Sequence, residues 1–329
     1  MYFNRRFLLL FGICLLSAIS EPLLILGTAA KNTPIVFMSR RDGNPELYVM
    51  DTDGGNQTRL TKHRADDLSP TWSPDGKKIA FVSNRNKGYL QIWVMDADGR
   101  NPIRLTDGFW DERPDWSPDG KRIAYDVIPN PKERALWTRV IFVMDADGMN
   151  NKRLTNQDGA SPSWSPDGRK IAFESSRADR SSEIYVMEAD GRNQKRLTHD
   201  FGDNRDPTWS PDGRYIAYIG NWDIVSWNIH VIDSDGKNQR ILTKKGWDQD
   251  PTWSPDSESI AFSGTDRVGP LWGIYIVDVG SGAVKMISEI HREGDYQPDW
   301  LNPVGLSVSA AGSRVTTWGR LKDIARSLR

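Results

Sequence analysis

The sequence has 329 residues, of which 38% are hydrophobic and 26% are charged, a balance typical of a globular protein with a large core. The formal net charge is −1, so no electrostatic attraction to nucleic acid is expected. The single cysteine, Cys14, excludes a framework of disulfides.

The first 30 residues differ from the rest of the chain. Arg5 and Arg6 precede the apolar run FLLLFGICLLSAIS, and small residues lie near Ala30. This order predicts a secretory signal peptide over residues 1–30, and hence an exported protein, periplasmic or extracellular. The alternative is an uncleaved membrane anchor, although the unbroken apolar run is short for a membrane span.

A repeated motif dominates the chain from residue 35 to residue 300. Each repeat contains a P-x-W segment, an apolar triplet such as Ile79–Phe81, an alternating run such as Ile92–Asp96 and an RLT segment such as Arg104–Thr106. We interpret these segments as antiparallel strands a, b, c and d, because each is short, rich in β-branched and aromatic residues and bounded by Gly, Pro and Asp. The repeat tryptophans lie 44 to 48 residues apart, at Trp72, Trp116, Trp164, Trp209, Trp253 and Trp300.

Four strands in about 45 residues are typical of one propeller blade. The first repeat, from Ile35 to Thr61, lacks its own strand a, and the last P-x-W segment, Gln297–Trp300, lacks strands b to d. The sequence therefore predicts an all-β, six-bladed β-propeller over residues 31–300, with four-stranded antiparallel blades. Pairing of the C-terminal strand with the N-terminal blade should close the ring. The repeat tryptophans are expected to wedge between adjacent blades.

The combination of P-x-WSPDG-x-x-IAF, IYVMDADG-like runs and RLT resembles the propeller repeat of the TolB family, over residues 35–300. TolB carries a further domain before its propeller, where this sequence has only the predicted signal and a few residues. The resemblance implies work in envelope assembly or transport. Similar propellers precede the hydrolase domain of prolyl-oligopeptidase-like enzymes, but the sequence contains no G-x-S-x-G motif.

The remaining aromatic residues favour one face of the ring as a binding face. Loops from strand d to the next strand a, and from b to c, emerge together and carry Trp110, Trp137, Trp222, Trp227, Trp247 and Trp272, whereas the opposite face receives near-uniform SPDG and DADG turns. Trp, Tyr and Arg dominate binding hot spots. Packing between blades is the alternative, especially for Trp227 and Trp272. The residues assigned to the binding face are Trp110, Asp111, Arg113, Trp137, Trp222, Asp223, Trp247, Asp248, Asp67, Asp295 and Tyr296.

Acidic residues recur three positions before the Pro of strand a. Asp67, Asp111, Asp248 and Asp295 occupy four of the six positions. They either cap the turn that enters strand a or form an acidic ring at the channel mouth, which would attract a cation or a basic group.

No cofactor is predicted. The DADG turns, such as Asp96–Gly99, resemble part of a calcium loop but lack its distal Glu, so a hairpin turn explains them. Calcium or another cation at the channel is the alternative. His63, His199 and His291 follow strand d and should lie at the rim, and His230 lies on a strand c, so convergence on one metal is not expected.

Residues 301–329 form a basic tail. Trp318, Leu321, Ile324, Ala325 and Leu328 share one face of a predicted short helix, which either packs on the propeller or docks on a partner or a membrane surface. We therefore expect an exported, monomeric, non-catalytic propeller that binds a protein or peptide in the cell envelope and touches the membrane only through its terminal segments. The alternative is a carbohydrate-binding module, or a propeller lyase or hydrolase acting at the channel mouth.

Overall fold

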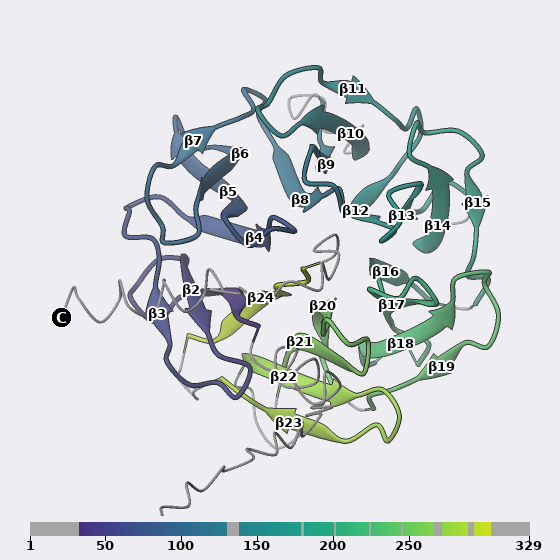
Figure 1. Cartoon of the computed structure of the whole chain (residues 1–329). Coiled ribbons are helices and arrows are strands. Elements are labelled where there is room, and N and C mark those ends of the chain that lie inside the picture. Colours follow the sequence, from purple (N-terminus) through teal and green to yellow (C-terminus); the bar gives the residue numbers. More distant parts are fainter. Residues whose placement is uncertain are drawn as a thin grey trace, which may run out of the picture.

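The structure, a computed structural model, describes residues 33–129, 138–178, 181–200, 202–223, 225–244, 246–265, 272–288 and 293–303. Six four-stranded antiparallel sheets surround a common centre (Figure 1). This arrangement confirms the six-bladed propeller predicted from the sequence. No helix occurs among the described residues, and so none there is long and apolar enough to cross a membrane.

The blades follow the chain in order, except that the first takes its inner strand from the C-terminal end. Blade 1 consists of β24 (Asp295–Trp300), β1 (Ile35–Ser39), β2 (Glu46–Met50) and β3 (Thr58–Arg59). Blade 2 consists of β4 (Asp67–Trp72), β5 (Lys78–Asn86), β6 (Tyr89–Asp96) and β7 (Ile103–Arg104). Blade 3 consists of β8 (Asp111–Trp116), β9 (Arg122–Val127), β10 (Val140–Asp145) and β11 (Lys152–Arg153).

The remaining three blades repeat this pattern. Blade 4 consists of β12 (Ala160–Trp164), β13 (Lys170–Ser175), β14 (Glu183–Glu188) and β15 (Lys195–Arg196). Blade 5 consists of β16 (Asn204–Trp209), β17 (Tyr215–Gly220), β18 (Asn228–Asp233) and β19 (Arg240–Ile241). Blade 6 consists of β20 (Gln249–Trp253), β21 (Ser259–Thr265), β22 (Trp272–Asp278) and β23 (Val284–Met286).

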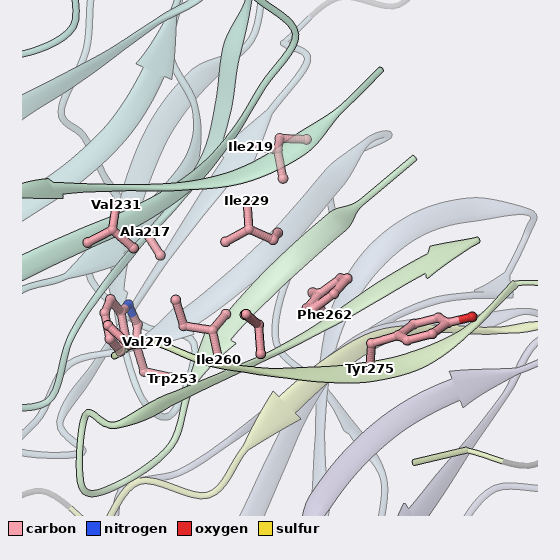
Figure 2. Close-up of a cluster of buried hydrophobic side chains, with 10 residues drawn as sticks. Ala217, Ile219, Ile229, Val231, Trp253, Ile260, Phe262, Tyr275 and Val279 are labelled. Carbon is pink, nitrogen blue, oxygen red and sulfur yellow. The ribbon is translucent and has the colours of Figure 1, made fainter. Parts of the chain in front are cut away.

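The repeat tryptophans lie between blades. Trp253 is fully buried in a cluster that joins Ile219 and Ile229 of blade 5 to Ile260 of blade 6 (Figure 2). Trp300 joins blade 1 to blade 6 in the same way. All six are 0 to 8% exposed. Each blade thus buries a large aromatic against its neighbour, and one hydrophobic cluster lies at each of the six interfaces between blades.

The WSPDG motif forms the turn between strands a and b. In blade 2, the Ser73 hydroxyl accepts the N–H of Lys78 at 2.9 Å and donates to Asp75 Oδ1 at 2.8 Å. Gly76 takes a positive φ of 67° and donates its N–H to the Ser73 carbonyl. The motif recurs because its Ser and Asp side chains satisfy backbone and hydroxyl groups of the same turn, and its Gly adopts the positive φ that the turn needs.

The turn between strands c and d touches the preceding blade. Gly99 has a φ of 86°, and a Cβ there would lie 2.3 Å from the carbonyl oxygen of Leu60 in blade 1. Within the turn, Asp96 accepts the side-chain amide of Asn101 at 2.7 Å. A hairpin turn therefore accounts for the Asp and Gly of the DADG motif. We call the side of the ring that carries the a–b and c–d turns the turn face, and the opposite side the loop face.

Every strand a contains a bulge. The residue before its Pro has a positive φ of 46 to 52°, and the pairing with strand b, or with β1 in the case of β24, shifts register at this point. A bulge bends the strand and redirects side chains. The six bulge residues are Ser69, Arg113, Ser161, Asp206, Asp250 and Gln297.

Candidate binding site at the channel mouth and loop face

The four aspartates expected to form an acidic ring are buried. Asp67 and Asp295 are 0% exposed, and each accepts two hydrogen bonds from an arginine: Arg85 at 2.8 and 2.7 Å, and Arg41 at 3.0 and 3.0 Å. Their charges are neutralised inside the blade, so the interpretation of these carboxylates as an exposed acidic ring needs correction.

Asp111, the first residue of β8, and Asp248, the residue before β20, are buried as well. Asp248 accepts the hydroxyl of Thr243, which belongs to the RLT segment of the preceding blade. Burial raises the pKa of Asp111 to about 6, against the opposing effects of hydrogen bonds from Thr106 and the Gly108 backbone. All four aspartates therefore stabilise the turn that enters strand a. This was the alternative to an acidic ring at the channel mouth.

The bulge residues form the polar lining of the channel instead. Ser69, Arg113, Ser161, Asp206, Asp250 and Gln297 surround a cavity of about 150 Å³, together with the neighbouring prolines. Of these, only Arg113 was assigned to the site from the sequence. The missed signal lies in the repeat itself: the residue before Pro varies among the blades, whereas the Pro and the Trp do not.

A cluster of carboxylates surrounds Arg113. Its guanidinium nitrogens lie 3.7 Å from Asp126, 3.9 Å from Glu174 and 3.8 Å from Asp206. Enclosure in the channel raises the pKa of Glu174 to about 7, assisted by the charge of Asp206 and opposed by Arg113. Burial and the charge of Asp206 also raise the pKa of Asp250 to about 6. Arg139 also pairs with Asp126, at 3.1 Å, and with Glu112, at 2.6 Å. Carboxylates still outnumber these two arginines, so keeping all of them ionised is unfavourable.

A second polar layer lies nearer the turn face. Asp115 and Asp299 line a cavity of about 110 Å³ with Thr71, Ser163, Thr208 and Thr252, the residues that directly precede the repeat tryptophans. Burial raises the pKa of Asp115 to about 8 and that of Asp299 to about 6. The channel is therefore polar from one face to the other.

The loop tryptophans have different environments. Trp247 is 51% exposed, and its backbone pairs with that of Trp227. The Arg205 guanidinium lies over the Trp227 ring at 5.0 Å from the ring centroid. Trp247 therefore projects from a rigid support formed by two adjoining loops.

The other assigned aromatic residues are half-buried. Trp222 contacts His230 at 4.3 Å between ring centroids and donates its indole N–H to Asn204 at 3.2 Å. Trp272 packs against Tyr296 at 5.2 Å. Trp110 is half-buried and pairs through its backbone with Leu90. Asp223 is exposed and caps its loop by accepting the N–H of Ser226 at 2.8 Å. Trp137 lies outside the described residues.

Sequence reasoning missed an exposed aromatic pair. Tyr89, at the start of β6, and Phe109, in the loop before β8, pack edge to face at 4.9 Å and are 39% and 45% exposed. Both belong to the loop face, and neither is among the residues assigned to it from the sequence. Blades 2 and 5 are three apart in a ring of six, so Tyr89 and Phe109 lie across the channel mouth from Trp247.

The histidines do not converge among the described residues. His63 and His199 are exposed after strands β3 and β15, and His230 is fully buried in β18. His291 lies outside the described residues. Among the residues that the structure describes, no group of three or more His, Cys, Asp and Glu side chains is arranged to hold a metal ion.

The closed ring, its shared first and last blade and its polar channel define a repeat-built propeller of the type found in binding proteins and enzymes alike. The TolB beta propeller domain family matches residues 30–136, 114–223 and 139–306. The chain therefore belongs to the TolB beta propeller domain family.

Individual relatives agree with this assignment. The Tol-Pal system protein TolB of Syntrophotalea carbinolica is 49% identical over 45 residues, which are 14% of this chain and 10% of the relative. The chain thus matches only about a tenth of the length of such curated relatives. The crystal structure of TolB from Acinetobacter baumannii is similar with a TM-score of 0.72 and 26% identity, covering 82% of this chain and 67% of that one.

An enzyme shares the architecture more distantly. An oligogalacturonate lyase in complex with manganese has a TM-score of 0.54 and 15% identity, covering 79% of this chain and 75% of that chain. At this identity the similarity concerns the fold alone, and it carries no statement about chemistry.

Proposed function

We propose that this protein is a non-catalytic binding platform of the cell envelope, which takes a protein or peptide partner on its loop face. The observation that carries the proposal is the pair of exposed aromatic sites, Tyr89 with Phe109 and Trp247 beside Trp227, on opposite sides of the channel mouth. Rigidly supported aromatic side chains are the residues from which binding hot spots are built.

The channel mouth between these sites suggests the chemistry of the partner. Asp206, Asp250 and Glu174 lie around one arginine, and the raised pKa values of Asp250 and Glu174 indicate that additional positive charge there would be favourable. A partner that presents a lysine, an arginine or an amino terminus to the channel would relieve this repulsion. The partner is therefore expected to be basic where it meets the ring.

Family membership supports a role in the envelope. The named relatives are Tol-Pal system proteins, and the same role here would require export, as the sequence of residues 1–30 predicts. Among the described residues, no particular arrangement of side chains favours the carbohydrate-binding or lyase alternative.

The test is capture from an envelope extract with the tagged full chain as bait, read by mass spectrometry. A second bait carries Phe109→Ala and Trp247→Ala, which remove exposed rings from the loop face. A matched control carries Met149→Ala and Ile241→Ala, which remove side chains that are 63% and 39% exposed away from that face. A third bait, with Asp206→Asn and Asp250→Asn, tests the charge of the channel.

The proposal requires one protein that is retained by the wild-type and control baits and lost from the loop-face bait. Neutralising the channel should weaken this retention and reduce its sensitivity to salt. Equal capture by all four folded baits, or capture by none, would contradict the proposal.

A further inference from the structure

A second hollow lies on the turn face, away from the proposed binding face. It is a groove of about 860 Å³ between blades 2 and 3. Its apolar walls include Val94, Ile103, Leu105, Trp116 and Ala146. The side chain of Ile103 is 62% exposed, so this groove offers apolar surface to a ligand rather than a closed core.

Comparison among the blades shows that this groove departs from the repeat. Ile103 is the first residue of strand d, and the corresponding residues of the other blades are Thr58, Lys152, Lys195, Arg240 and Lys285. The corresponding cavity between blades 3 and 4, which Lys152 lines, is only about 280 Å³. A polar exposed position has thus become apolar at one place, beside the larger hollow.

The groove also has an acidic rim. Asp75, Asp119, Asp147 and Asp167 line it. Lys78, the one basic residue in its wall, forms an ion pair with Asp96 at 2.6 Å, and Lys77 beside the rim pairs with Asp75 at 3.1 Å. An occupant with an apolar face and basic flanks would match both features.

The described chain ends on the same face as this groove. Leu301 donates its N–H to the Pro34 carbonyl at 3.0 Å, and its side chain lies against Gly76, next to Asp75 of the rim. Asn302 lies at the turn-face end of the channel, where it donates its side-chain amide to the Trp253 carbonyl of blade 6 at 3.0 Å. Residues 304–329 therefore follow from the turn-face end of the channel, whose walls share Trp116 and Pro118 with the groove.

The chemistry of the C-terminal segment fits this site. Residues 304–329 contain five basic residues and one acidic residue, and Trp318, Leu321, Ile324 and Leu328 recur at helical spacing. Residues 304–317 could extend about 45 Å at about 3.3 Å per residue, more than enough to reach a neighbouring groove.

We propose that the segment Thr316–Arg329 docks as a short amphipathic helix in the groove between blades 2 and 3 of its own chain. Trp318, Leu321 and Leu328 cover the apolar wall at Ile103, and the basic residues face the aspartates of the rim. The docked segment covers the turn face and leaves the loop face free for a partner.

Hydrogen–deuterium exchange of the full chain tests this proposal. Amides of residues 318–328 should exchange at least about tenfold more slowly than the same residues in a free peptide. Ile103→Lys, which installs the residue of blades 3 and 4, should abolish this protection. Ile241→Arg is the matched control, because it also replaces an exposed strand-d isoleucine by the residue of other blades, but in blade 5. If Ile103→Lys fails to fold, Leu321→Asp provides the same test from the tail.

Protection that disappears in Ile103→Lys and Leu321→Asp and persists in Ile241→Arg, in a monomer and independently of concentration, supports the proposal. Unprotected tail amides in the wild-type chain would overturn it. Protection that rises with protein concentration would indicate docking into a second copy. Protection that develops only with vesicles of anionic lipid would indicate a membrane surface, and either outcome would also overturn the proposal.

Discussion

The carboxylate of Asp115 in blade 3 accepts the backbone N–H of Trp164 in blade 4 at 2.6 Å. Asp299 of blade 1 accepts the N–H of Trp72 in blade 2 at 2.7 Å in the same way. Elsewhere a hydroxyl group is the acceptor: the Thr252 hydroxyl of blade 6 accepts the backbone N–H of Trp300 in blade 1 at 3.2 Å. In each case the residue before the repeat tryptophan of one blade accepts the backbone N–H of the repeat tryptophan of the next blade. At two places this residue is an aspartate in the channel.

Replacing Asp115 by Asn should flatten the dependence of stability on pH. Burial raises the pKa of Asp115 to about 8 in the folded protein, whereas its unfolded value is about 4. Between these values the folded state binds the additional proton, so this group makes the protein less stable as the pH rises from about 4 to 8. Asn retains an oxygen that can accept the Trp164 N–H.

Denaturant unfolding at pH 5 and pH 8 measures this effect. Asp115→Asn should be more stable than the wild type at pH 8, and the difference should shrink at pH 5. A wild-type advantage at pH 8 would show that the ionised carboxylate stabilises the fold.

Replacing His230 by Phe should reduce the loss of stability at low pH, whereas Asp115→Asn acts at high pH. His230 occupies a strand-c position at which the other blades carry Tyr48, Trp93, Phe142, Tyr185 and Tyr275, so an aromatic side chain is accommodated there. Burial lowers the pKa of His230 to about 4. Between about pH 6.5 and 4 the unfolded state therefore binds more protons than the folded state. The contribution of His230 to the free energy of unfolding decreases as the pH falls through that range.

Thermal unfolding from pH 7 to pH 4 compares the two proteins. His230→Phe should lose less stability on acidification than the wild type. Parallel curves would show that His230 is protonated in the folded protein without penalty.

Replacing Gly99 by Ala should destabilise the contact between blades 1 and 2. The φ of 86° disfavours a side chain, and the added Cβ would meet the Leu60 carbonyl at 2.3 Å. Gly88 is the matched control, because its φ is 78° and no atom lies within 4 Å of an added Cβ.

Gly88→Ala should cost about 1 kcal/mol, the penalty of the left-handed backbone alone. Gly99→Ala should cost more than Gly88→Ala in the same denaturant titration, and the excess measures the contact between the blades. Equal losses of unfolding free energy in the two variants would mean that the turn at Gly99 shifts away from Leu60 without cost.

Replacement by Ala should greatly reduce the stability of the fold at Trp300 and hardly change it at Trp247. Trp300 is 6% exposed, joins blades 1 and 6 and donates its indole N–H to Thr33 at 3.0 Å, so its truncation should cost about 3 to 5 kcal/mol of unfolding free energy. Trp247 is 51% exposed, and its truncation should change stability by less than about 0.5 kcal/mol. A large loss with Trp247→Ala would assign this residue to the core rather than to the binding face.

The periodic part of the fold could be predicted from the sequence, because each WSPDG turn and RLT strand is specified by residues within one repeat. Closure could be predicted because the strand missing at Ile35 is supplied at Trp300. The lining of the channel could not be predicted, because the bulge before each Pro rotates one side chain into the channel. Strand periodicity alone does not reveal such a bulge. Asp206 and Asp250 were therefore overlooked, while the buried Asp67 and Asp295 were assigned to the surface because their arginine partners lie in other segments of the chain.

The pairing of β24 with β1 also governs when the molecule can be completed. Ile35 pairs with Trp300, so the edge of β1 stays open until nearly the whole propeller has been synthesised. Such a long separation in sequence makes this a late and slow step of folding. The chain therefore remains without its final seam until its last strand has been synthesised, and only then does it become a closed ring.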